Sequence, residues 1–203
     1  MADRLNAMIQ RDIEADPSSP YEPYFLAVAL FFYQASMPYS RITQSLKYHG
    51  DIGAGKYFSD MLGEKLASSP LYSGVDTVVP VPLHWTRRWE RGYNQAEVIA
   101  KELARKLGAN LRTDILRRVR RTRTQTRLSV PDKEKNVRTA FVVTKGYSGK
   151  IKGGRLSPPS HILLVDDVFT TGATTHACLK ALRTVLKPSV TRISVATLAV
   201  VGP

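Results

Sequence analysis

ILLVDDVFTTGATT, residues 162–175, contains three patterns in a fixed order. Ile162 to Val165 form an unbroken apolar run, as parallel strands that are covered on both faces require. Asp166 and Asp167 follow at once, and a threonine-rich turn around Gly172 then leads into a helical pattern. The order of strand, turn and helix predicts one unit of a parallel α/β sheet.

The same alternation of strands and helices extends along most of the chain. Strands are expected at residues 25–33, 76–81, 112–119, 140–144, 162–165 and 190–201, and helices at 40–49, 55–67, 94–107 and 174–186. The glycine- and proline-rich residues 146–160 are expected to form a connector. We therefore predict an α/β fold, with a twisted, mostly parallel central sheet and helices on both faces.

The composition favours a single α/β core and an anionic partner. The chain has 203 residues and a net charge of +13, and residues 112–138 carry ten Lys or Arg against three Asp or Glu. Cys178 is the only cysteine, which excludes an intrachain disulfide and makes a reducing cytoplasm the expected location. No apolar run approaches the ~20 residues of a membrane span, so no such span is expected.

Residues 166–174 combine groups that suit a sugar phosphate. The two carboxylates accept hydrogen bonds from sugar hydroxyls and are ligands for a metal ion. The N–H groups at the start of the following helix attract phosphate, and Gly172 allows close backbone approach. Either half of the stretch alone is more typical of an ordinary strand exit and helix cap, whereas the complete order is much more specific.

ILLVDDVFTTGAT resembles the phosphoribosyl diphosphate (PRPP) binding motif of type I phosphoribosyltransferases. The resemblance implies that Asp166 and Asp167 are the catalytic pair and hold the ribose 2- and 3-hydroxyls. It implies Mg²⁺ bound through PRPP, with these two carboxylates as candidate protein ligands. It also implies that the 5-phosphate lies in a loop made by Thr170, Thr171, Gly172, Ala173 and Thr174. The fold of that family is a twisted parallel sheet with a small N-terminal hood.

Three further stretches resemble the ComF-like branch of this family. They are SLKYHGD (45–51), VVPVPLHWTRRWERGYNQAEVIAKELA (78–104) and RTRTQTRLSVPDKEKNVRTAF (121–141), in the family's order. The resemblance predicts a polar arm (1–24) and a phosphoribosyltransferase domain (25–203), which divides into a hood (25–70) and a core (71–203). Many ComF-like proteins carry an N-terminal cysteine-rich zinc module, whereas this sequence has no cysteine before Cys178.

The end of the expected strand 76–81 is predicted to face pyrophosphate. In the family that the chain resembles, backbone N–H groups at this strand end contact pyrophosphate, often beside a non-proline cis peptide. Pro82, Leu83 and His84 occupy that position, and Arg91 adds a charge that suits phosphate. Without the resemblance, the same arginine-rich segment is typical of a solvated helix entrance.

The basic stretch 120–138 allows two interpretations. The resemblance implies a flexible lid, with Arg121, Arg123 and Gln125 as lid residues, because a closed lid excludes water from the reaction. Alternatively, the stretch contacts nucleic acid through backbone phosphates. No aromatic residue lies between Arg117 and Arg138, which disfavours base stacking in this stretch.

The resemblance therefore implies an enzyme that transfers phosphoribose from PRPP to a nucleobase-like nitrogen acceptor and releases pyrophosphate. It also implies Mg²⁺ as the cofactor and a homo-oligomeric state. A second hypothesis belongs to another class of protein. In it, the chain binds PRPP or a nucleotide without catalysis, or serves DNA uptake as an accessory protein that uses its basic face. The fold alone does not decide between the two hypotheses.

Overall fold

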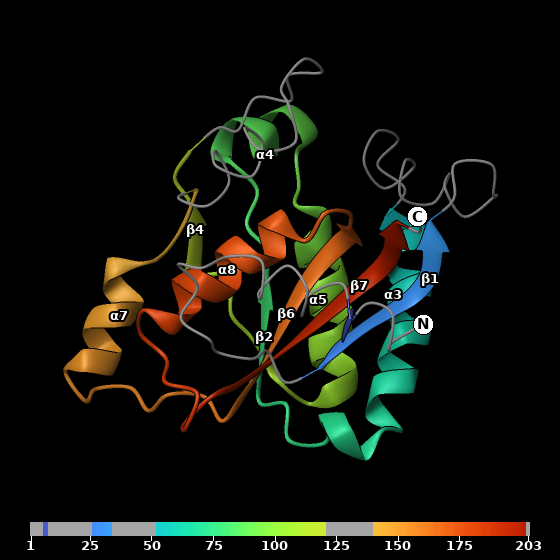
Figure 1. The fold of residues 1–203 in the computed structure, drawn as a ribbon. Coiled ribbons are helices and arrows are strands. Elements are labelled where there is room, and N and C mark those ends of the chain that lie inside the picture. Colours follow the sequence, from blue (N-terminus) through green and yellow to red (C-terminus); the bar gives the residue numbers. More distant parts are fainter. Residues whose placement is uncertain (1–5, 8–25, 34–51, 121–139, 202–203) are drawn as a thin grey trace.

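The computed structural model describes residues 6–7, 26–33, 52–120 and 140–201 (Figure 1). Within them, five parallel strands form the main sheet in the order β1-β7-β6-β2-β3. Their bounds are β1 Ala27–Tyr33, β2 Thr77–Pro80, β3 Asn110–Leu111, β6 His161–Phe169 and β7 Arg192–Val201. The predicted α/β fold with a mostly parallel sheet is confirmed.

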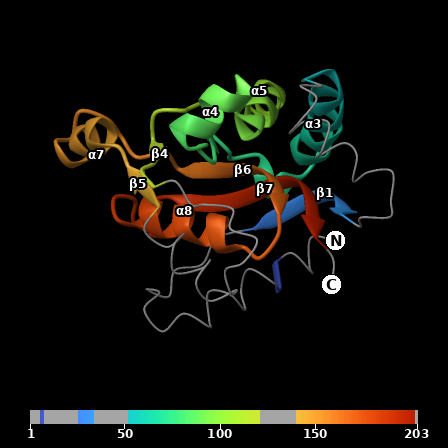
Figure 2. The same cartoon turned by 90° about the horizontal axis from the view of Figure 1, so that it is seen from above.

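Helices cover both faces of this sheet, as Figure 2 shows. One face carries α3 (Ile52–Ala67), α4 (Trp85–Arg91) and α5 (Gln95–Leu107), and the other carries α8 (Ala173–Arg183). A short 3-10 helix, η2 (Pro70–Tyr72), precedes β2. At one side stand α7 (Lys145–Lys152) and a two-stranded antiparallel sheet made of β4 (Leu116–Arg118) and β5 (Phe141–Val143).

The apolar run of β6 is buried from both sides. Along the apolar run, successive side chains alternate between the two faces of the sheet. Ile162 and Leu164 belong to the hydrophobic cluster that includes α8, whereas Leu163 and Val165 belong to the cluster that includes α3 and α5. Burying each such side chain contributes about 1.5–3 kcal/mol, so this run ties both helical layers to the sheet.

The prediction of one continuous strand at residues 112–119 is wrong. The parallel strand β3 ends at Leu111, and β4 begins at Leu116 and pairs with β5 in the other sheet. Between them, the Arg112 guanidinium donates to the Asp114 carboxylate at 2.7 and 2.8 Å. This two-point pairing accompanies the turn that moves the chain from one sheet to the other.

The connector expected at residues 146–160 is also partly wrong, because its first half forms the helix α7. Thr144 caps this helix, since its Oγ1 accepts the Tyr147 N–H at 3.3 Å. The buried Tyr147 side chain then anchors α7 in the core cluster on the α8 face. A cap and one aromatic anchor therefore outweigh the glycines that suggested a loop.

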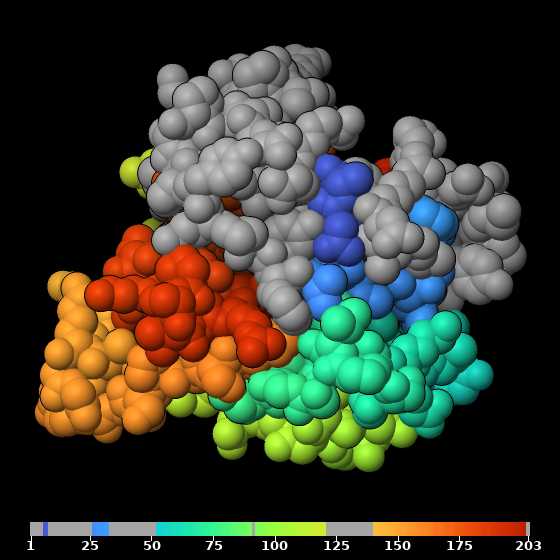
Figure 3. All heavy atoms as spheres, turned by 60° about the horizontal axis from the view of Figure 1, so that its bottom comes forward, coloured from blue at the N-terminus to red at the C-terminus, as the bar shows by residue number. Residues whose placement is uncertain are grey.

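Several predicted segments fall outside the described residues, among them the helix at 40–49 and most of the arm at 1–24. In the arm, the Asn6 side chain donates to the Ala27 carbonyl and accepts its N–H, at 3.1 and 2.9 Å, and Figure 3 shows residues 6–7 against β1. Of the predicted hood, β1 forms an edge of the main sheet and α3 packs against α5. The division into arm, hood and core stays a prediction.

None of the described helices has the length and apolar character needed to cross a membrane.

Tyr72 predicts a loss of stability in alkali. Its side chain is buried in η2, and burial raises the pKa of the phenol from 10.0 to about 12. Because the unfolded phenol ionises first, the free energy of unfolding should fall as the pH rises from about 10 to 12. Urea unfolding at about pH 9 and about pH 11 should show a smaller loss for Tyr72→Phe than for the parent. If the free energy of unfolding falls equally in Tyr72→Phe and in the parent, the alkaline destabilisation does not come from Tyr72.

Candidate functional site

The carboxyl ends of β2 and β6 lie side by side in the sheet. Pro80 pairs with Val165, and the Val81 N–H donates to the Val165 carbonyl at 2.8 Å. Asp166 and the loop from Val81 to His84 therefore leave the sheet at one edge, the edge that carries α4 in Figure 1. Ligands of parallel α/β sheets bind beyond the carboxyl ends of the strands, so this edge is the candidate site.

Asp166 and Asp167 lie within β6, which continues to Phe169 instead of ending at Val165 as predicted. Asp166 acts electrostatically on Cys178 of α8 and on Arg118, so its carboxylate lies near the α8 face. The alternation of faces reverses after Val165, because Val168 packs with the α3 and α5 cluster and Phe169 with the α8 cluster. Asp166 Oδ1 accepts the Asp167 N–H at 2.9 Å, and Asp167 Oδ1 accepts the Val168 N–H at 2.8 Å. Both carboxylates are half-buried at the end of the apolar run.

The predicted phosphate loop joins β6 to α8. Thr170 and Thr171 are exposed, and Gly172 has a φ of 79°, in the left-handed region that favours glycine. Ala173 and Thr174 form the first turn of α8, which contains no acidic residue and no side-chain cap. The N–H groups of this turn begin at the same edge as Asp166, an arrangement that suits an anion.

The predicted pyrophosphate residues lead into α4. The buried His84 caps this helix, since its Nδ1 accepts the Thr86 N–H at 3.4 Å and lies 2.9 Å from the Thr86 hydroxyl oxygen. Pro82 and Leu83 are half-buried, and the described residues contain no cis peptide bond, so the one that the resemblance implies here is not present. Arg91 is the last residue of α4, and its side chain lies outside the described part of the chain.

Asn94 fixes the position of this loop. Its Oδ1 accepts the Ala96 N–H at 3.2 Å and caps α5, which confirms the predicted helix start. Its Nδ2 donates to the Val81 carbonyl at 3.0 Å, and the side chain is buried. One amide therefore links the end of β2 to the start of α5.

We expect Asn94→Ala to lower the free energy of unfolding by about 1–3 kcal/mol, because a buried carbonyl and a helix end lose their partner together. Urea denaturation measures the change. Asn110→Ala is the matched control, since its amide donates to the Asp76 carbonyl at 3.3 Å from an exposed position. A loss for Asn94→Ala no larger than for Asn110→Ala would contradict the role of Asn94.

Arg118 is a further candidate site residue, one that the sequence did not single out. It comes from β4, and its guanidinium lies over the Phe141 ring, 5.2 Å from the centroid. Burial lowers the pKa of Arg118, the charge of Arg87 lowers it further, and Cys178 and Asp166 act in the opposite direction. The Arg118 cation therefore lies within electrostatic reach of Asp166 and of a second arginine.

The charge at this edge is mixed. Arg87 and Arg118 contribute two cations, and Asp166 and Asp167 contribute two carboxylates. No three His, Cys, Asp or Glu side chains gather as a metal site within the part of the chain that the structure describes. The predicted lid residues, Arg121, Arg123 and Gln125, lie outside that part.

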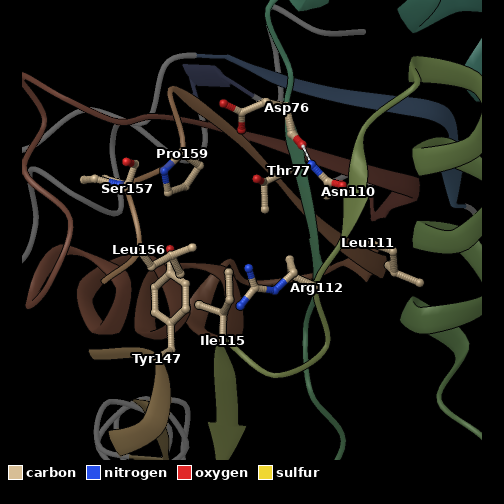
Figure 4. Close-up of a pocket in the computed structure, with 11 residues that line it drawn as sticks. Asp76, Thr77, Asn110, Leu111, Arg112, Ile115, Tyr147, Leu156, Ser157 and Pro159 are labelled. Carbon is tan, nitrogen blue, oxygen red and sulfur yellow. Dashed lines mark hydrogen bonds between the residues drawn. The ribbon is translucent and has the colours of Figure 1, made fainter. Parts of the chain in front are cut away.

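A separate pocket of about 470 Å³ lies near the amino ends of β2 and β3, away from the predicted residues (Figure 4). Asp76 and Asn110 line it on the strand side, and Tyr147 and Pro159 line it on the other. Its charged side chains already have partners within the fold, although the Asp76 Oδ1 atom is buried without one. Arg112 pairs with Asp114 and lies 5.3 Å from the Tyr147 ring centroid, and Asp76 accepts two hydrogen bonds of 2.7 Å from Ser160. The carboxyl edge remains the better candidate because only that edge unites the predicted residues.

Comparison with known proteins gives three informative relatives. Competence protein F of Haemophilus influenzae is 37% identical over 108 residues, which cover 53% of this chain and 44% of the relative. The DNA utilization protein YhgH is 36% identical in Salmonella typhi and 34% in Escherichia coli K12, over 99 residues in each case. Those 99 residues cover 49% of this chain and 39% of each relative.

The chain is related to the ComF proteins. This relationship agrees with the resemblance to ComF-like proteins that the sequence stretches show. The matched region spans less than half the length of these relatives, so what the whole proteins do does not transfer directly to this ComF-related chain. No family model and no solved structure matches the chain.

Proposed function

We propose that the carboxyl edge of the sheet binds PRPP, in a type I phosphoribosyltransferase fold. The observation that carries the proposal is the placement of Asp166, the Gly172 turn and the start of α8 at one edge beside the loop from Val81 to His84. This edge provides acceptors for sugar hydroxyls and N–H donors for a phosphate. The resemblance of residues 162–174 to the PRPP-binding motif supports the same ligand.

In this proposal each group has a separate task. Asp166 and Asp167 accept hydrogen bonds from the ribose hydroxyls, and the first turn of α8 with Thr170 and Thr171 holds the 5-phosphate. Arg118 and Arg87 face the diphosphate, for which guanidinium groups are suited. Mg²⁺, when bound, would neutralise charge on the diphosphate, and the two carboxylates are the protein groups that fit it.

The proposed reaction is phosphoribosyl transfer. The bond from the sugar C1 to the diphosphate oxygen breaks, and the electron pair leaves with pyrophosphate. A bond from a nucleobase-like nitrogen to C1 forms, and that nitrogen loses its proton. Preorganised carboxylates beside the sugar stabilise the positive charge that develops on it. We place this activity in the cytoplasm, and a homo-oligomeric state stays a prediction.

Calorimetric titration with PRPP and Mg²⁺ tests the proposed site. Ribose 5-phosphate and pyrophosphate are the control ligands, because each carries only one half of PRPP. PRPP is expected to bind more tightly than either half. If pyrophosphate alone binds as tightly as PRPP, the ribose and 5-phosphate contacts are absent and the proposal fails. Release of pyrophosphate that depends on an added nucleobase then distinguishes catalysis from binding.

A second proposed function is contact with DNA, for which the names of the relatives and the net charge of +13 are the observations. Such contact depends on phosphate charge, so the logarithm of the affinity should fall with the logarithm of the salt concentration. No binding of DNA at about 50 mM salt would exclude this function.

A further inference from the structure

Both tryptophans of the chain lie on α4 and are strongly exposed. Trp85 is 73% exposed and Trp89 is 87% exposed. They are four residues apart, so their side chains lie on the same face of the helix. Tryptophan is usually well buried, and an exposed pair of this kind indicates an interaction surface.

The exposure follows from how α4 is held. His84 caps the start of the helix, and Gly92, with a φ of 78°, ends it by donating its N–H to the Arg88 carbonyl at 2.8 Å. The helix is therefore fixed at both ends, while neither tryptophan belongs to the buried clusters of the fold. Figure 1 shows α4 projecting at the carboxyl edge of the sheet.

Positive charge surrounds the two indole rings. Arg87 and Arg88 lie between them in the sequence, and Glu90 is the one acidic residue of the helix. The Arg88 side chain is 57% exposed and pairs with Glu97 at 3.3 Å, a surface pair that holds it only weakly. Arg87 also adds to the positive charge around Arg118. An apolar protein partner fits this surface poorly, because Arg88, three residues after Trp85, flanks the aromatic rings on the same side of the helix.

We propose that α4 is a docking surface for single-stranded nucleic acid. Bases stack on the rings of Trp85 and Trp89, and the strand's phosphates pair with Arg88. A single strand fits better than a duplex, because paired bases do not expose their ring faces. The proposal rests on the DNA contact proposed above and gives it a location other than the basic stretch 120–138, which has no aromatic residue.

Intrinsic fluorescence tests the proposal directly, since all tryptophan emission comes from α4. The folded chain is titrated at about 50 mM salt with a short oligothymidylate, an oligouridylate of equal length, a duplex and phosphatidylserine vesicles. We expect quenching by a single strand, either DNA or RNA, and weak or no quenching by the duplex. Anisotropy of a labelled oligothymidylate should show at least tenfold weaker binding for Trp85→Ala with Trp89→Ala.

Three variants make the result specific. Tyr57→Ala is the matched control, because Tyr57 is 64% exposed on α3, at the other end of the same helical layer in Figure 2. It should bind as the parent does. Trp85→Phe with Trp89→Phe keeps aromatic rings and should retain most of the affinity in the anisotropy assay. Far-ultraviolet circular dichroism checks that each variant is folded.

The outcomes separate this proposal from those above. If the oligonucleotide binds without quenching and the Trp→Ala variant binds as the parent does, α4 is not the surface, while DNA contact stands. Equal affinity for duplex and single strand overturns the stacking role, and quenching by vesicles alone assigns α4 to a membrane surface. If no nucleic acid binds, both nucleic-acid proposals fail, and the PRPP titration remains an independent result.

Discussion

Replacing Asp166 and Asp167 together by asparagine is expected to abolish measurable PRPP binding and to leave the fold intact. Each carboxylate is proposed to accept a hydrogen bond from a ribose hydroxyl, and a hydrogen bond to a charged group contributes about 1.5–3 kcal/mol. Losing two such bonds weakens binding by roughly 100-fold or more. The fold survives because an asparagine Oδ1 can still accept the backbone N–H that each Oδ1 accepts now, at 2.9 and 2.8 Å.

Calorimetric titration measures the expected loss of PRPP binding. Thermal unfolding checks that the double variant keeps its fold. Asp60→Asn is the matched control, because Asp60 lies on α3 and pairs with Arg105 and Lys106, each at 2.9 Å, away from the carboxyl edge. It should bind PRPP as the parent does. If the double variant does so too, the motif does not bind PRPP and the assignment of the site is wrong.

The single variants should differ from each other. Asp166 acts electrostatically on Arg118 and on Cys178 of α8, whereas Asp167 is not among the groups that shift the pKa of either residue. A ligand whose phosphate lies at the start of α8 therefore has more contact with Asp166. We expect Asp166→Asn to account for most of the loss of the double variant.

The parts of the fold that the sequence predicted are those with a strong local pattern. The apolar run of β6 is buried on both faces, and the helix predicted at residues 94–107 is α5, with Asn94 and Gly108 at its two ends, where these residue types are favoured. Each of these signals depends on neighbours in the sequence, so no knowledge of the tertiary fold was needed. The placement of the phosphate loop at the carboxyl edge followed from the same strand, turn and helix order.

The parts that the sequence did not predict depend on contacts between distant residues. β6 extends through Asp166 and Asp167 because β7 continues to pair with it as far as Phe169. The strand expected at residues 112–119 is divided because β4 finds its partner in β5, on the far side of residues 121–139. No local pattern reports such pairings. The same pairing brings Arg118 to the site.

Arg118→Met is expected to weaken binding of PRPP and of pyrophosphate by about tenfold or more, and to leave binding of ribose 5-phosphate unchanged. The expectation follows from the proposed contact of Arg118 with the diphosphate, since a charge-assisted hydrogen bond contributes about 1.5–3 kcal/mol. Methionine keeps an apolar side chain against Phe141, and removing a buried charge relieves its desolvation cost. Thermal unfolding should therefore show no loss of stability.

Arg117→Met separates a local contact from a general effect of charge. Arg117 neighbours Arg118 in β4 but is exposed, and adjacent residues of a strand are on opposite faces. The two variants remove the same charge, so a long-range field would weaken pyrophosphate binding equally in both, and more so at low salt. A loss confined to Arg118→Met, and retained at higher salt, is the result that a direct contact requires. Equal losses would remove Arg118 from the site and leave the diphosphate to the backbone of the loop from Val81 to His84.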